Sequence, residues 1–530
     1  MDTGDMLQKR LGMLDQLIAN RQLQQAIVLG EQLRKEQPAS VHACLSLSEA
    51  YRQLGQFTAA RACAEIAYQL EPGDGFVCAQ YAHTLVPFAD HNAIQALLQQ
   101  HLRQNTKTVW VDEMMGAAAV SIDEWQLALS CFDRVLELQP EHLHAQYMRG
   151  VALSVLGAKD DAILAFKKLI RERPGYGRAW WSLADLDLSE VDEKQLMQLL
   201  GNKQLHESDR VYFWQVLGQL QQRSGNHGAA FESWENANQI KHRNQAIQSA
   251  CWDELAAALL YQAETFSAAI ASVSTDSPIF IVGLPRSGST LVEQLITNSG
   301  QVRALGELRD LEVLVQQAIG LDPVPLPFKL DRKSSERIVP AEIANAYIQR
   351  VHSRCADRRY SDKNPVNFLF VGIILQAFPN ARIIHVHKHP MDACLGVFKH
   401  QFAAAAPWSY SVSDIAHFYT LYQNVMSAWE RLYPGRVCHV AYEDLLQHPD
   451  KVTQKIYAYC DLAWSDKVMD LTLRKGPVLS ASANQVREGV HTRALFAHRN
   501  FEAQLEPFRQ ALLDSGLQPD DIWQIGVKND

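Results

Sequence analysis

The chain has 530 residues, which is too long for one ordinary hydrophobic core and predicts two or three domains. Its 50 lysines and arginines against 59 aspartates and glutamates give a formal charge of −9. This balance argues against a general binder of nucleic acid or of anionic membranes. Any site for an anion must therefore be built locally from a few residues.

The nine cysteines stand singly with no C-x-x-C pair, so the sequence indicates neither a disulfide framework nor a zinc site. The first ten residues, M-D-T-G-D-M-L-Q-K-R, contain acids and no apolar segment, and no run of about 18 apolar residues follows. We therefore expect no signal peptide, no membrane span and a cytoplasmic location.

Three residue types recur in the first half of the chain with a period of 34 residues, the spacing of tetratricopeptide repeats. The series are Pro38, Pro72, Pro140 and Pro174; Ala26, Ala60, Ala128, Ala162 and Ala230; and Gly55, Gly157 and Gly225. Small residues let paired helices approach, and proline ends the second helix of a pair. The sequence thus resembles tetratricopeptide proteins over about residues 5 to 245.

Two repeats, at about 73 to 106 and 175 to 208, lack most of these markers: Thr106 replaces a proline and Leu196 an alanine. We interpret them as degenerate units of one all-α solenoid at residues 1–250. Such arrays present a concave groove, which favours docking of a protein or peptide partner. A dimerisation or scaffolding arm is the alternative, since the tryptophans of this half can equally be packing residues.

An apolar helical stretch near 251 to 273 falls in a connecting segment, residues 251–277. The pattern then changes to short apolar runs alternating with helices. Residues 279–283, 381–387 and 436–440 are typical of buried parallel strands. The sequence therefore predicts an α/β domain with a parallel sheet over residues 278–530.

The loop after the first of these strands has the glycine spacing of a phosphate-binding P-loop, with Gly283 and Gly288 in register. Ser289 stands where the P-loop lysine belongs, and no acid follows the strand at 381–387. Metal-dependent triphosphate chemistry is therefore disfavoured. A helix starting near Thr290 would still present free N–H groups to an anion, and Arg286 adds a cation to the loop.

Six ordered motifs in this half resemble those of sulfotransferases, and most of all bacterial tetratricopeptide–sulfotransferase fusions and, more distantly, tyrosylprotein sulfotransferases. The motifs are G-L-P-R-S-G-S-T-L, V-R-A-L-G-E-L-R, D-K-N-P, I-I-H-V-H-K-H-P-M-D-A-C-L, V-A-Y-E-D-L-L-Q-H-P and S-A-N-Q-V-R. The resemblance covers about residues 278 to 505. It implies that the loop holds the 5′-phosphosulfate of 3′-phosphoadenosine 5′-phosphosulfate (PAPS).

The resemblance also implies how the loop and the D-K-N-P motif act. Arg286 would grip the 5′-phosphate and the transferring sulfonate, together with the backbone and hydroxyls of Ser287, Gly288, Ser289 and Thr290. Lys363 would lie beside the leaving oxygen and offset its charge. An ordinary surface lysine next to a turn is the alternative for Lys363.

Further catalytic roles are implied in the same way. Glu307 matches the general base that takes the acceptor proton, and Arg309 matches an arginine that supports the site. Without the resemblance, the two would be read as a solvated ion pair. Ser482 corresponds to a serine near the leaving group, and Tyr442 to an aromatic residue of the nucleotide site or else to a core tyrosine.

The expected 3′-phosphate site departs from the family pattern. Lys388 and Gly396 stand where relatives have arginine and serine, and Ala497-His498 replace a basic residue followed by tryptophan, which leaves Arg499. Lysine provides a point charge but not the bidentate fork of arginine. The sequence thus predicts weakened recognition of the 3′-phosphate, or recognition through Lys399, Arg493 or Arg499.

The leading hypothesis is a PAPS-dependent sulfotransferase that needs no metal, with a hydroxyl acceptor such as a peptide tyrosine docked by the repeats. A glycan or a small hydroxylated metabolite is the alternative acceptor. A hypothesis of a different functional class is that the chain is a non-catalytic adaptor whose donor site is degenerate. His385, His387 and His389 alternate along one strand, and structural roles are favoured over a metal site. We expect no nucleic-acid partner, and a homodimer is an open alternative.

Overall fold

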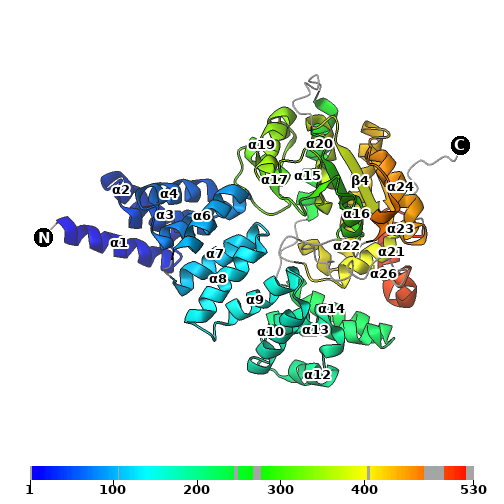
Figure 1. The fold of residues 1–530 in the computed structure, drawn as a ribbon, viewed down its shortest axis with the longest axis horizontal. Helices are drawn as coiled ribbons and strands as arrows, with labels where there is room; N and C mark the ends of the chain where they lie inside the picture. Colours follow the sequence, from blue (N-terminus) through cyan, green and yellow to red (C-terminus); the bar gives the residue numbers. More distant parts are fainter. Residues whose placement is uncertain are drawn as a thin grey trace. The chain divides into compact units, whose positions relative to one another are not determined.

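The computed structural model describes residues 3–104, 107–243, 249–266, 276–402, 406–470 and 495–520. They form two compact units (Figure 1): Met1–Leu156 with Val313–Val324, and Gly157–Glu312 with Pro325–Asp530. The predicted domain limits at 250 and 277 stay a prediction. All nine cysteines are free thiols, and no described helix has the length and apolar character needed to cross a bilayer.

The first unit consists of helices that follow the predicted period. The first helices of successive pairs begin at Val41, Gly75, Val109 and Leu143. Each predicted proline in this unit lies two residues after the end of a second helix, so it stops that helix as expected. The helices are α1 (Thr3–Ala19), α2 (Leu23–Glu36), α3 (Val41–Gln53), α4 (Phe57–Leu70), α5 (Gly75–Leu85), α6 (His91–Arg103), α7 (Val109–Ser121), α8 (Trp125–Leu138) and α9 (Leu143–Val155).

The turns between paired helices adopt a left-handed backbone conformation at the same period. Gly55, Gly157 and Gly225 have φ of 74°, 89° and 81°. Ala89 and Asp123, in repeats without the glycine, have φ of 51° and 59°. The degenerate repeat at 73 to 106 therefore forms the same helix pair, α5 and α6, with a less suitable turn residue.

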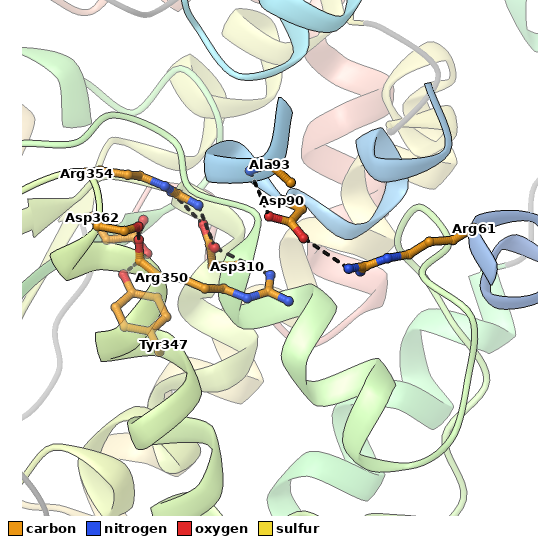
Figure 2. Close-up of polar contacts among 9 residues, drawn as sticks. Arg61, Asp90, Ala93, Asp310, Tyr347, Arg350, Arg354 and Asp362 are labelled. Atoms are coloured by element: carbon orange, nitrogen blue, oxygen red, sulfur yellow. Dashed lines mark hydrogen bonds and ion pairs between the residues drawn. The ribbon is translucent and has the colours of Figure 1, made fainter. Parts of the chain in front are cut away.

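A short segment from the second half of the sequence belongs to the first unit. Val313–Val324 includes Asp322, whose Oδ1 accepts a 2.6 Å hydrogen bond from the Thr58 amide at the start of α4. In the same unit, Arg61 pairs with Asp90 at 3.3 Å, and Asp90 caps α6 through the Ala93 amide (Figure 2). These contacts fix the first turns of α4 and α6.

The second unit begins with the remaining repeat helices. They are α10 (Lys159–Glu172), α11 (Gly177–Leu186), α12 (Glu193–Gly201), α13 (Glu207–Arg223) and α14 (His227–Arg243), followed by α15 (Ser249–Thr265). Gly218 of α13 lets α14 approach closely, because a Cβ there would lie 2.3 Å from the indole nitrogen of Trp234. The all-helical repeat region that the sequence predicts is thus confirmed.

A parallel sheet of five strands in the order β2-β3-β1-β4-β5 follows. The three predicted strands correspond to β1 (Ile279–Gly283), β4 (Arg382–His387) and β5 (Val437–Ala441). Sequence reasoning missed β2 (Arg303–Ala304) and β3 (Tyr360–Asp362), because two or three residues are too few to show a periodic pattern.

Helices cover both faces of this sheet (Figure 1). Ile281, Ile384 and Val440 pack with α16 (Ser289–Thr297), α23 (Tyr442–Gln447) and α24 (Pro449–Tyr459) on one face. Phe280 contacts Tyr347 of α19 (Pro340–His352) and Phe378 on the other, where α20 (Val371–Ala377) and α22 (Val412–Leu432) also lie. Burial on both faces explains the unbroken apolar runs.

Candidate active site

The carboxyl ends of the parallel strands meet at one edge of the sheet, where ligands bind in open α/β folds. Each strand is followed there by a residue that the sequence singled out. They are Arg286 after β1, Glu307 after β2, Lys363 after β3, Lys388 after β4 and Tyr442 after β5. The topology therefore gathers residues that are up to about 150 positions apart in the chain.

The loop between β1 and α16 depends on two glycines. A Cβ on Gly283 would lie 2.3 Å from the Val386 carbonyl oxygen, and one on Gly288 would lie 2.3 Å from the Tyr442 ring. Gly288 has φ of 102°, and Arg286 itself has φ of 70°, a left-handed conformation that is unusual for arginine. The backbone is thus held close to β4 and to Tyr442.

This loop has the features of an anion site. Helix α16 begins at Ser289, so its first N–H groups lie at the loop. The hydroxyl of Ser287 is buried and has no hydrogen-bond partner among the described residues. Ser289 and Thr290 are also buried. The residues present therefore fit a phosphate or sulfate group.

Arg286 provides the cation of the loop. Burial lowers the pKa of its guanidinium, while the charges of Asp185 and Glu307 and the phenol of Tyr442 act in the opposite direction. The positive charge of Arg286 is therefore partly shielded from water, where it interacts more strongly with an approaching anion than at the open surface.

Lys363 and Glu307 form an ion pair at the other end of the site. The Lys363 side chain is fully buried, whereas the Glu307 side chain is 50% exposed. The Lys363 amide donates to the Gly306 carbonyl at 2.8 Å, and the Asn364 side chain donates to the Leu308 carbonyl at 2.9 Å. These bonds fix the Glu307 loop beside the end of β3, so the surface-lysine interpretation of Lys363 is wrong for this fold.

A buried polar cluster supports both residues of that pair (Figure 2). Asp310, three residues after Glu307, accepts two hydrogen bonds from Arg354 at 2.7 and 2.8 Å and one from Arg350 at 3.5 Å. The Tyr347 hydroxyl donates to Asp362 at 2.8 Å. Burial, helped by the charge of Asp310, raises the pKa of Asp362 to about 8.

Helix α19 and the turn after it thus anchor the ends of β2 and β3. Sequence reasoning missed this cluster, because Tyr347, Arg350 and Arg354 lie outside the recognised motifs. Within the recognised motifs, the one sequence signal for this cluster was Asp362, the aspartate of D-K-N-P.

Lys388 lies beside Tyr442. Its ammonium nitrogen is 4.0 Å from the centre of the Tyr442 ring, a cation–π distance. Burial lowers the pKa of Lys388 to about 8, and the positive charge of Arg286 contributes. Tyr442 thus contacts both the loop glycine and this lysine, and its predicted role in the nucleotide site stays a prediction.

The other predicted site residues are less central. Arg309 is 43% exposed and pairs with Glu312 at 3.4 Å. Arg499 is exposed in the short helix η8 (Ala497–Phe501), with its guanidinium 4.5 Å from the centre of the Phe496 ring. Ser482 and Arg493 lie outside the described residues, so their predicted roles stay predictions.

The three histidines at the end of β4 occupy structural positions. His385 contacts Tyr422 and has its Nδ1 2.8 Å from that of His439. Burial lowers the pKa of His387 to about 3 and that of His389 to about 4. In the part of the chain that the structure describes, no three histidine, cysteine or carboxylate side chains gather as metal ligands.

Comparison with known proteins agrees with these observations. Residues 278–466 match the sulfotransferase family, and residues 41–74 and 114–186 match tetratricopeptide repeats. An uncharacterized protein of Aquifex aeolicus is 25% identical over 398 residues, which cover 72% of this chain and 52% of that protein. The chain therefore spans about half the length of this relative.

Two further relatives are named as tyrosine sulfotransferases. A putative protein-tyrosine sulfotransferase of Caenorhabditis briggsae is 24% identical over 233 residues, 41% of this chain and 79% of that protein. The protein-tyrosine sulfotransferase of Drosophila melanogaster is 22% identical over 206 residues, 36% of this chain and 39% of that protein.

Two solved structures each cover part of this chain. A tetratricopeptide repeat protein from Parabacteroides merdae has 13% identity and a TM-score of 0.35, covering 44% of this chain and 93% of its own. The sulfotransferase domain from a Synechococcus olefin synthase has 19% identity and a TM-score of 0.33, covering 47% and 96%. The family matches and the site residues carry the conclusion: this chain joins an N-terminal tetratricopeptide region to a C-terminal domain of the sulfotransferase family.

Proposed function

We propose that the chain transfers a sulfonate group from PAPS to a hydroxyl group by direct displacement. The observation that carries this proposal is the ion pair of buried Lys363 with half-exposed Glu307, at the sheet edge that also holds the phosphate-binding loop. An acid, a cation and an anion loop are the groups that such a transfer requires.

The reaction divides among these groups as follows. The loop and Arg286 hold the 5′-phosphosulfate. The acceptor oxygen attacks sulfur, the bond from sulfur to the bridging oxygen breaks, and the acceptor proton goes to Glu307. Arg286 and Lys363 offset the negative charge that develops on the leaving 5′-phosphate. No metal is needed in this scheme.

The ion pair of Lys363 with Glu307 is compatible with both roles. A lysine ammonium has three N–H donors, so Lys363 can keep its bond to Glu307 while a second N–H reaches the leaving oxygen. The bond orients the Glu307 carboxylate, whose side chain is half exposed and so accessible to an acceptor.

For the acceptor we favour a protein hydroxyl, such as a peptide tyrosine, docked by the repeats. In the first unit, α1, α3 and α5 line a cavity of about 640 Å³. It combines acids with apolar groups: Asp15, Glu49, Glu71 and Asp74, and Ile18, Val41, Leu45, Phe76 and Val77. We call it the acidic groove, and its charge suits a peptide with basic and apolar residues.

The nucleotide product of the reaction, adenosine 3′,5′-bisphosphate, gives the primary test. The full chain should be stabilised against heat by this ligand in excess, and it should transfer labelled sulfonate from PAPS to a hydroxyl acceptor. A non-catalytic adaptor would show neither effect. Stabilisation without transfer to any peptide would favour a glycan or small-metabolite acceptor, to be screened next.

A further inference from the structure

A second cavity, of about 450 Å³, lies inside the second unit between the last repeat helices and the phosphate-binding loop. We call it the basic cavity. One wall comes from α11, α13 and α14, and the other from Arg286 and from the end of α21 (Pro390–Phe398) with the residues after it. The residues used below are Trp181, Asp185, Arg223 and Trp234 on the repeat side, and Arg286 and Lys399 on the other.

The repeat wall is firmly attached to the sulfotransferase domain. Phe231 of α14 stacks on Phe398 at 4.9 Å with an angle of 19° between the rings. The buried Asn238 side chain donates a 2.7 Å hydrogen bond to the Phe398 carbonyl. Trp234 also contacts Phe501 of η8. Because these contacts are buried and apolar, α14 is an integral wall of the domain rather than a loosely tethered arm.

Positive charge dominates the basic cavity. Arg223, Arg286 and Lys399 line it, against one acid, Asp185. Burial lowers the pKa of Lys399 to about 8, and the nearby charge of Arg286 acts in the same direction. Arg286 and Lys399 are partly buried and Arg223 is exposed, and cations that repel each other are stabilised when an anion enters.

The remaining lining suits a flat ring with polar edges. Trp181 and Asp185 share one face of α11, and Gln219, Gln222 and Arg223 share one face of α13. Lys399 has its ammonium nitrogen 6.0 Å from the centre of the Trp234 ring. Trp234 is fully buried, whereas the Trp181 indole is partly exposed. An exposed indole face and amide side chains are the groups that stack on and hydrogen-bond a nucleobase, and the volume is that of a small-molecule site.

We propose that the basic cavity holds the adenosine 3′-phosphate end of PAPS, so that the tetratricopeptide helices α11 and α13 complete the donor site. This inference rests on the proposed function. If the loop holds the 5′-phosphosulfate, the adenosine must extend into space next to Arg286, and the cavity begins at Arg286. Arg223 and Lys399 contact the 3′-phosphate, and Trp181 lies against the base.

Calorimetry on the full chain with two nucleotides tests the inference. Adenosine 3′,5′-bisphosphate carries the 3′-phosphate, and adenosine 5′-phosphate lacks it. Arg223→Met and Lys399→Met should each raise the Kd of the bisphosphate about tenfold and change that of the monophosphate less than threefold. Lys203→Met, which removes the same charge at an exposed position outside the cavity lining, should change neither.

The outcomes separate the two proposals. If the wild type binds neither nucleotide, the donor assignment itself fails. If the wild type binds the bisphosphate more tightly than the monophosphate and both Met variants keep that preference, the basic cavity is not the 3′-phosphate site. Variants that change only the KM of the acceptor would assign the cavity to the acceptor and overturn the inference.

Hydrogen exchange on the wild type gives a second measurement that needs no variant. The bisphosphate should protect amides of residues 177–186 and 207–223 more than the monophosphate does. Equal protection of these segments by both nucleotides would contradict a 3′-phosphate contact from the repeats, even if a variant proved too unstable to study.

Discussion

The acidic groove of the first unit and the basic cavity of the second are lined by the same kind of element, the helices of tetratricopeptide pairs. The acidic groove has four carboxylates and one histidine, whereas the basic cavity has three cations, one histidine and one carboxylate. The helix-pair geometry therefore does not select a ligand. A few side chains on the exposed faces of the helices do, and one array can serve a cationic peptide and an anionic nucleotide.

The two regions also differ in what surrounds the repeats. In the first unit, α3 and α5 leave their shared face to solvent, and exposed Phe76 and Trp110 stack on each other at 4.5 Å. In the second unit, α14 is buried against α21 and η8. The first region is thus suited to docking a macromolecule, and the second to enclosing a small one.

The comparison predicts that the proton-transfer step depends on Glu307, which lines neither cavity. Glu307→Gln keeps the size of the side chain and removes the proton acceptor, so sulfonate transfer should fall about 10²–10⁴-fold while the bisphosphate Kd stays unchanged. Single-turnover transfer and calorimetry measure the two quantities. Near-normal turnover would place the base on another residue.

The basic cavity should respond to pH where the acidic groove does not. Lys399 of the basic cavity and Lys388, which lies beside Tyr442 outside the cavity lining, have pKa values lowered to about 8, so both carry charge below pH 8 and lose it as pH rises above 8. The 3′-phosphate does not titrate in this range. Between pH 7 and pH 9.5 the affinity for the bisphosphate should therefore fall about tenfold, as measured by calorimetry.

Binding of a basic peptide to the acidic groove, which neither lysine lines, gives the comparison. Its affinity should change less than twofold between pH 7 and pH 9.5. Equal pH dependence of the two ligands would mean that a global change in the protein, rather than the two lysines, causes the effect.

Gly396→Ser should strengthen binding of the bisphosphate in the basic cavity. A Cβ at Gly396 would lie 3.8 Å from the Arg286 Cβ, an ordinary contact, so the side chain fits and adds a hydroxyl donor. The Kd of the bisphosphate should fall about three- to tenfold in calorimetry. Gly201→Ser, at a glycine with open space around it, is the matched control and should leave the Kd unchanged. Weaker binding of Gly396→Ser would indicate that the ligand needs this space.

A charge reversal tests the acidic groove. Glu71→Lys should raise the KM for a protein acceptor with basic residues about two- to fivefold, since an exposed charge contributes little, and should not affect nucleotide binding. Glu141→Lys, exposed in the same unit but outside the groove lining, serves as the control. Identical KM values for both variants would remove the docking role from the groove.

The smallest effect concerns the left-handed turn that the repeats with Gly55, Ala89, Asp123, Gly157 and Gly225 share. Ala89→Gly should stabilise its repeat by less than about 1 kcal/mol, because glycine removes the cost of a left-handed alanine but loses more entropy on folding. Gly55→Ala should destabilise its repeat by about 1 kcal/mol. Hydrogen exchange in α5 and α6, and in α3 and α4, reports each change locally. Stabilisation by both changes would contradict the turn argument.

The sequence by itself determined the features that are written in short, local patterns. The period of 34 residues gave the repeat helices, because each pair needs its own small residues and its terminating proline. Apolar runs gave β1, β4 and β5, because strands buried on both faces show no alternation. The resemblance of the ordered motifs to those of sulfotransferases predicted the loop, Glu307, Lys363 and Lys388 as site residues.

Only the tertiary structure decided which distant residues meet. The parallel sheet sets Glu307 against Lys363, which are 56 positions apart. It also brings Asp310 to Arg354 across 44 positions. The packing of Phe231 on Phe398 closes the basic cavity with helices whose own pattern indicates only a repeat. Such contacts join side chains that are far apart in the chain, so no local sequence pattern predicts them.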